Sequence, residues 1–154
     1  MTGRDRVAMT PDEVQAMLAG HRRVQSATRN PDGSTHLVTM FYVLLDGRIA
    51  FWTYRSSQKA RNLARDPRIT CLVETGDEYF DLRGVQVRGV VEVFDAGDDV
   101  LAVGRGVAEG VAGVPPDAVD DYVRHAARKR VAYAVRPERI VSWDHRKLVT
   151  SSRP

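Results

Sequence analysis

The chain has 154 residues, 43% of them hydrophobic and 28% charged, and its formal net charge is +3. This composition is that of a single globular domain and excludes a disordered or fibrous protein, while the lone Cys71 excludes an intramolecular disulfide and a multi-cysteine metal site. The apolar runs are far shorter than the ~18 residues that span a bilayer, and residues 1–9 lack the apolar segment of a secretory signal, so we expect a cytoplasmic protein without a membrane partner.

The first half of the chain predicts one helix followed by three strands. Residues 1–9 are expected to be a flexible tail. Thr10, Pro11 and Glu13 form a capping box with proline at the first helical position, and Gly20 ends the helix. Strands are predicted over residues 22–28, 35–45 and 48–54, with the last two joined at Asp46-Gly47, a strong hairpin signal.

The second half of the chain predicts a short helix, more strands and two longer helices. The short helix covers residues 57–65 and must stop at Asp66-Pro67, because the residue before proline avoids the helical region. Gly89 indicates a bulge or bend inside its strand, as a closing barrel requires. The remaining elements are strands over residues 68–74, 85–94, 131–135 and 139–143 and helices over 98–109 and 116–128.

This order of elements favours an antiparallel sheet, because most strands follow one another without crossover helices. We therefore predict a mainly β, α+β protein with a closed or half-closed barrel and helices at its ends. One domain covers residues 10–148, and residues 149–154 are expected to be a loose tail.

Polar and basic side chains concentrate where the strand ending at Tyr54 meets the helix beginning at Ser57. Free N–H groups and the dipole at a helix N-terminus favour an anion. Hydroxyl groups and cations could complete a phosphate site; they belong to Thr53, Arg55, Ser56, Ser57, Lys59 and Arg61. The alternative is a capped surface helix with solvated charges.

The charge distribution also favours a small anionic ligand. Basic residues are concentrated between Arg55 and Arg68, whereas the segment from Asp95 to Asp121 is strongly acidic. The sequence has no long basic stripe interleaved with aromatic residues, so we expect no nucleic-acid partner. The histidines lack the spacing of metal ligands, and we predict no metal site.

Two tryptophans offer large flat surfaces for a planar ring, although either could instead fill the barrel core. Trp52 precedes the phosphate site, and Met40 and Phe41 are expected close to it on the hairpin partner strand. Trp143 ends the last strand and is followed by a polar cluster, as at the rim of a pocket.

Residues 51–69 carry a recognisable pattern. A strand ends in an aromatic residue and Thr53, then come Ser57-Gln58-Lys59, Asn62-Leu63 and Asp66-Pro67-Arg68 before an apolar strand. Residues 87–92 and 136–143 fit the same pattern. From these residues the chain resembles the pyridoxamine 5′-phosphate oxidase-like superfamily of split-barrel flavin and deazaflavin proteins, over most of its length, from about residue 10 to residue 148.

The resemblance implies a homodimer with two cofactor sites across the subunit interface. Ser57 and Lys59 would hold the cofactor phosphate, Thr53 would contact the ring system or its chain, and Trp143 would come from the partner chain or close the pocket. The full predicted cofactor site comprises Thr39, Met40, Phe41, Thr53, Arg55, Ser57, Gln58, Lys59, Arg61, Asn62, Gln86 and Trp143.

Departures from the oxidases proper argue against vitamin B6 oxidation. Gln58 stands where they carry arginine, their strand glutamine falls at Gly84 with Gln86 two residues further, and their C-terminal arginine-histidine signature is missing. The chain looks closer to the short actinobacterial-type branch, many members of which use the deazaflavin coenzyme F-420.

The resemblance thus implies hydride transfer between F-420 and a small organic substrate, with no catalytic side chain required from the protein. The alternatives are an FMN-binding oxidoreductase on the same fold, and a non-enzymatic flavin or haem binding protein, in which His36 or His145 could bind haem.

Overall fold

The computed structural model describes residues 1–109 and 114–150, and within them seven strands form a single sheet in which all neighbours are antiparallel. This arrangement confirms the predicted antiparallel α+β fold. The strands are β1 (Arg23–Arg29), β2 (Thr35–Phe41), β3 (Val43–Leu45), β4 (Arg48–Tyr54), β5 (Arg68–Thr75), β6 (Arg83–Phe94) and β7 (Arg130–Asp144).

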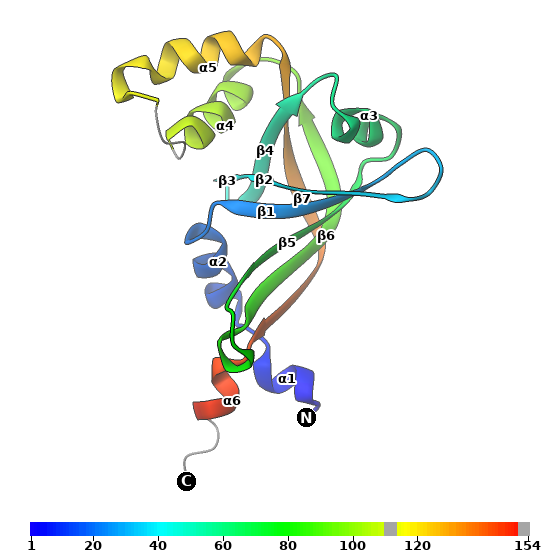
Figure 1. Cartoon of the computed structure of the whole chain (residues 1–154), viewed down its shortest axis with the longest axis vertical. Coiled ribbons are helices and arrows are strands. Elements are labelled where there is room, and N and C mark those ends of the chain that lie inside the picture. Colours follow the sequence, from blue (N-terminus) through cyan, green and yellow to red (C-terminus); the bar gives the residue numbers. More distant parts are fainter. Residues whose placement is uncertain (110–113, 151–154) are drawn as a thin grey trace.

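The helices lie at the ends and on one face of this sheet (Figure 1). They are α1 (Gly3–Val7), α2 (Pro11–Ala19), α3 (Gln58–Arg65), α4 (Asp98–Glu109), α5 (Val119–Ala127) and α6 (Arg146–Thr150), with 3-10 turns η1 (Tyr79–Asp81) and η2 (Pro116–Ala118). The predicted capping box is present, since Thr10 and Glu13 side chains each accept the other's backbone N–H, at 3.2 and 2.8 Å. No helix in the described part of the chain combines the length and apolar character needed to cross a membrane.

A single residue, Tyr42, carries the chain from one edge of the sheet to the other. The strand order is β2-β1-β5-β6-β7-β4-β3, so the consecutive strands β2 and β3 lie at opposite ends of it. The sheet must therefore curl until its edges meet, which makes a split barrel (Figure 1). The prediction of a single strand over residues 35–45 is therefore wrong, because barrel closure divides this segment into two strands at opposite edges of the sheet.

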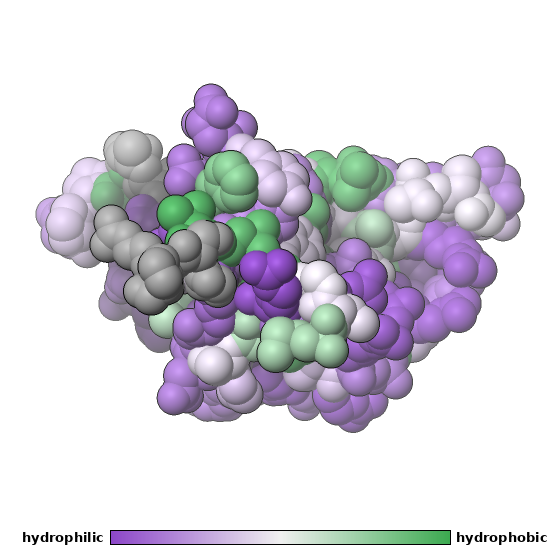
Figure 2. Space-filling model, turned by 90° about the horizontal axis from the view of Figure 1, so that it is seen from below, coloured by the Kyte–Doolittle hydropathy of each residue, from purple (hydrophilic) through white to green (hydrophobic). Residues whose placement is uncertain are grey.

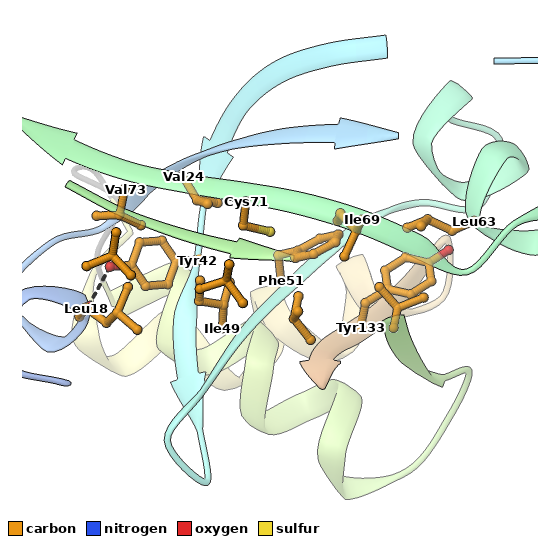
Figure 3. Close-up of a cluster of buried hydrophobic side chains, with 14 of the residues drawn as sticks. Leu18, Val24, Tyr42, Ile49, Phe51, Leu63, Ile69, Cys71, Val73 and Tyr133 are labelled. Atoms are coloured by element: carbon orange, nitrogen blue, oxygen red, sulfur yellow. Dashed lines mark hydrogen bonds between the residues drawn. The ribbon is translucent and has the colours of Figure 1, made fainter. Parts of the chain in front are cut away.

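The main core fills the inside of the curl (Figure 3). Phe51 is completely buried and lies against Tyr133, with ring centroids 5.3 Å apart. Tyr42 is buried as well and donates its hydroxyl hydrogen bond to the Leu18 carbonyl at the end of α2. Cys71 is fully buried, and burial raises the pKa of its thiol to about 12, so it is a core side chain rather than a reactive group.

A second core lies on the other face of β4 and β7, beneath α4 and α5. Small residues, among them Ala50, Ala132 and Ala134, let the helices approach the sheet closely. Trp52 fills the space under α4 so tightly that a Cβ on Gly104 would lie 2.5 Å from its ring. Trp52 therefore packs between the sheet and the helix pair. Residues 110–113 of the predicted break between these helices lie outside the described residues.

The last two predicted strands form one continuous strand, β7, which pairs with β6 over most of its length. The register shifts between Arg88 and Gly89, and this confirms the bend predicted at Gly89. Gly89 stands opposite Pro137, and a Cβ there would lie 2.1 Å from the Arg136 carbonyl oxygen. The close approach of the two backbones therefore requires glycine at this position.

The chain ends are more ordered than expected. Instead of a flexible tail over residues 1–9, the structure has α1, which begins with a capping box between Thr2 and Asp5 and buries Val7. The Met9 N–H donates to Ser142 Oγ at 3.0 Å, which ties this segment to β7. α6 runs to Thr150, beyond the expected start of the loose tail, and residues 151–154 lie outside the described residues.

Candidate functional site

The N-terminus of α3 presents unused hydrogen-bond donors next to the end of β4. Ser57 caps the helix, because its Oγ accepts the Ala60 N–H at 3.2 Å. Its Oγ also accepts from the buried Thr53 hydroxyl at 3.2 Å, so the Ser57 hydroxyl proton remains to be donated to a ligand. The backbone N–H groups of Gln58 and Lys59 make no hydrogen bond within residues 1–109 and 114–150. These donors suit a phosphate group.

Lys59 adds a cation to this end of the helix. Its side chain is half-buried, and burial lowers the pKa of its ammonium group because the charged form loses solvation. In the described part of the chain no carboxylate lies within ion-pair distance of it. A bound anion would supply the missing counter-charge, so the residues present fit a cofactor phosphate.

The predicted arginines of the site differ in their surroundings. Arg55 is neutralised by Asp95, since its guanidinium donates to the carboxylate at 2.9 Å and to the backbone carbonyl at 2.7 Å. Arg61 is exposed and has no ion-pair partner among the described residues. Of the two, Arg61 alone keeps a charge that is free to meet a ligand.

Asn62 and Gln58 belong to the framework of α3. Asn62 is completely buried, and its amide donates to Thr28 Oγ1 at 3.1 Å and to Asn30 Oδ1 at 3.0 Å. Its carbonyl oxygen accepts from Gln58 at 2.9 Å and from Arg65 at 3.3 Å. Both donors and both acceptor positions of Asn62 are therefore occupied, and the side chain ties α3 to β1 instead of facing a ligand.

The remaining predicted residues come from other strands. Thr39, Met40 and Phe41 lie on β2, and not on the hairpin partner of β4, which is β3. The expectation that Met40 and Phe41 face Trp52 across that hairpin is therefore wrong, because the chain changes edges at Tyr42. Gln86 is half-buried in the middle of β6, opposite Leu72 and Val141.

Trp143 lies far from α3 within one chain. Arg130, at the start of β7, pairs with Tyr54 beside α3, and Trp143 comes 13 residues later on the same strand. At ~3.3 Å per residue this is roughly 40 Å of extended strand. Its indole instead covers Gly84, where a Cβ would lie 2.1 Å from the ring. A single chain therefore does not bring Trp143 to the phosphate site.

The sequence analysis missed one cation beside this region. The Arg130 guanidinium lies 4.2 Å from the ring centroid of Tyr54 and 5.0 Å from that of Trp52. The local sequence carries no signal for this contact, because the pairing of β4 with β7 brings together residues far apart in the chain. Arg130 holds the end of β4 in place and flanks the start of α3.

A protein-family model described as pyridoxamine 5′-phosphate oxidase matches residues 10–144. The chain belongs to this family. This match agrees with the split-barrel fold. No curated protein matches the chain in sequence.

Solved structures extend the comparison for this pyridoxamine 5′-phosphate oxidase family member. The conserved hypothetical protein Rv2991 from Mycobacterium tuberculosis is 38% identical, with a TM-score of 0.89 over 97% of this chain and 93% of its own. An F420 reductase is 25% identical, with a TM-score of 0.59 over 82% and 94%. A heme binding protein from Mycobacterium smegmatis is 19% identical, with a TM-score of 0.64 over 94% and 62%. The family and these neighbours establish the fold, while the names of the neighbours span different functions.

Proposed function

We propose that this protein is an oxidoreductase that binds the deazaflavin F-420 and transfers hydride between it and a small organic substrate. The surroundings of Lys59 carry the proposal. Its side chain is a half-buried cation without a counter-charge in the described chain, and it is the second residue of a helix whose first N–H groups are free. When bound, the cofactor supplies the hydride chemistry. The protein supplies position and charge, so the proposal needs no acid or base from the chain.

The positions of Ser57 and Thr53 support a phosphate at this site. Thr53 is the last residue but one of β4, and its hydroxyl donates to the Ser57 hydroxyl, which in turn caps α3. The phosphate would then receive hydrogen bonds from Ser57, from the Gln58 and Lys59 N–H groups and from the Lys59 ammonium. Charge-assisted bonds of this kind contribute about 1.5–3 kcal/mol each.

F-420 is preferred over FMN for two reasons. One structural neighbour is an F420 reductase at 25% identity. F-420 also carries a longer and more anionic tail than FMN, and Arg61 offers a charge beyond the one that a single phosphate needs. Because exposed ion pairs are screened by salt, the affinity for F-420 should fall more steeply with ionic strength than the affinity for FMN. FMN at the same site is the alternative, and it would be favoured if the affinities for F-420 and FMN fell equally with ionic strength.

A homodimer would complete the site. The edge strand β2 exposes Leu37 and Phe41, at 68% and 45% of their surface, and large apolar side chains on a sheet edge favour burial against another chain. Since Trp143 lies far from α3 in its own chain, we propose that it closes the pocket of the partner subunit.

Titration of F-420 and FMN into purified cofactor-free protein, followed by cofactor fluorescence, tests the proposal. We expect Lys59→Ala to weaken binding of the preferred cofactor roughly ten- to a hundredfold. Arg6→Ala, which removes an exposed cation from α1 at the other end of the molecule, is the matched control and should bind normally. Unchanged affinity in Lys59→Ala would make α3 an ordinary surface helix and overturn the proposal.

Haem binding is a second candidate because of His145. Its Nδ1 lies 2.8 Å from the Tyr79 carbonyl oxygen, which fixes the proton on Nδ1 and leaves Nε2 as a potential ligand. The ring borders a cleft lined by Tyr79, Val141 and Trp143, at the end of the molecule seen in Figure 2. A sharp Soret band on adding haemin, lost in His145→Ala, would support this function in place of the first.

A further inference from the structure

A cleft lies away from the start of α3, on the outer face of the sheet. It has a volume of about 520 Å³, and residues of the neighbouring strands β1, β5, β6 and β7 line it. We call it the arginine cleft, because its lining includes four arginines, Arg29, Arg68, Arg88 and Arg139. Ser57 and Lys59 do not line it, so it is distinct from the proposed cofactor phosphate site.

The strand register explains both the hollow and the charge. Ala27 stands opposite Thr70, Thr70 opposite Arg88, and Arg88 opposite Arg139, which makes one row across four strands. Small side chains at Ala27 and Thr70 leave the floor of the cleft open. Arg88 points outward, because its neighbours Val87 and Gly89 are buried.

Arg88 and Arg139 face each other as like charges on adjacent strands, an arrangement that destabilises a sheet. The cleft contains two carboxylates, Asp66 and Glu138, which leaves two positive charges in excess. Asp66 is already bonded to Arg68, with 2.8 Å between Oδ2 and Nη2. The guanidinium groups of Arg29, Arg88 and Arg139 make no ion pair within the described residues.

We propose that the arginine cleft binds a small anion with several carboxylate or phosphate groups. Each guanidinium can hold such a group by two parallel hydrogen bonds. Strands lie ~4.8 Å apart, so Arg29 on β1 and Arg139 on β7 project from backbones about 14 Å apart. Anionic groups distributed over several ångströms therefore fit the site better than a single phosphate, and their binding removes the repulsion between Arg88 and Arg139.

Calorimetric titration of cofactor-free protein with citrate, pyrophosphate and inorganic phosphate at low ionic strength tests the proposal. We expect citrate or pyrophosphate to bind at least about tenfold more tightly than inorganic phosphate. Arg88→Ala/Arg139→Ala should weaken that binding roughly ten- to a hundredfold. Arg6→Ala/Arg128→Ala removes the same charge from exposed positions outside the cleft and should bind as the wild type does. Arg88→Lys keeps the charge but cannot form two parallel hydrogen bonds, so its affinity for the anion should lie between those of the two double variants.

Three further measurements separate this site from its alternatives: the melting temperature, competition by F-420 and the molecular mass. Because Arg88 and Arg139 repel each other, Arg88→Ala/Arg139→Ala should melt no lower than the wild type, and citrate should raise its melting temperature less than that of the wild type. If F-420 competes with citrate, the anionic groups are those of the cofactor tail; if it does not, they belong to a separate ligand. Equal anion binding by both double variants would overturn the proposal in favour of non-specific attraction. A changed molecular mass in Arg88→Ala/Arg139→Ala alone would overturn it in favour of a contact between subunits.

Discussion

The side chains of α3 divide into those that hold the helix and those that are free to bind. Asn62 uses all of its hydrogen-bonding capacity on β1 and its own helix, whereas Lys59, three residues earlier, has no counter-charge in the described chain. Both residues were predicted as cofactor ligands, because sequence spacing does not distinguish a buried amide from a ligand-facing amine. The difference arises from the rotation of α3 against β1, which turns Asn62 inward.

Gly89 allows the bulge between β6 and β7, and Gly89→Ala should therefore destabilise the protein. A Cβ would lie 2.1 Å from the Arg136 carbonyl oxygen, so a strand must shift. We expect a loss of about 3 kcal/mol in the free energy of unfolding, measured by urea denaturation. Gly3→Ala is the control, since nothing lies within 4 Å of its Cβ position. A loss below about 1 kcal/mol at Gly89 would contradict the close backbone contact.

Asp66 gives stability a predictable dependence on pH. The hydrogen bonds from Arg68 lower the pKa of the Asp66 carboxyl from 3.8 to about 2. A carboxyl whose pKa is lower in the folded state stabilises the fold at pH values above its unfolded-state pKa. This contribution is lost as the pH falls through the folded-state pKa of about 2. Asp66→Asn should therefore lower the melting temperature at pH 7, with the difference from wild type shrinking between pH 4 and pH 2. A difference that does not change with pH would contradict this assignment.

Among the elements, the predictions succeeded where the signal was local. The capping box at Thr10, the stop at Pro67 and the bend at Gly89 each depend on the chemistry of a few neighbouring residues, and the structure contains all three. The failures concern contacts between distant residues. The division at Tyr42 follows from barrel closure, and α1 is held by contacts with β7. The arginine cleft was missed for the same reason, because its residues come from four separate strands.

The attachment of α3 to the barrel can be tested through Asn62. Asn62→Ala removes hydrogen bonds to Thr28, Asn30, Gln58 and Arg65 and leaves buried groups without partners. We expect a loss of about 2–4 kcal/mol in the free energy of unfolding and weaker cofactor binding. Arg61→Ala, on the exposed face of the same helix, should change stability by less than about 0.5 kcal/mol. Similar losses in the two variants would contradict the anchoring role of Asn62.

At the scale of the whole molecule, the proposed dimer predicts a mass of twice the 17.2 kDa chain in light scattering. Leu37→Glu places a charge on the exposed face of β2 and should shift the mass to that of one chain. Val149→Glu, at a similarly exposed position on α6, is the control and should remain a dimer. A wild-type mass of one chain would contradict the dimer. A dimeric Leu37→Glu variant would show that the interface does not include the exposed face of β2.

The passage of the chain through Tyr42 has a consequence for the order of folding. β2 pairs with β1 and β3 pairs with β4, each across a local turn, but these two hairpins lie at opposite edges of the sheet, so the barrel closes around Tyr42 only after the strands between those edges have assembled and curled. Closure is therefore expected after the rate-limiting barrier, and Tyr42→Phe, which removes the hydrogen bond to Leu18, should accelerate unfolding while leaving the refolding rate nearly unchanged. In stopped-flow experiments this corresponds to a φ-value near zero at Tyr42.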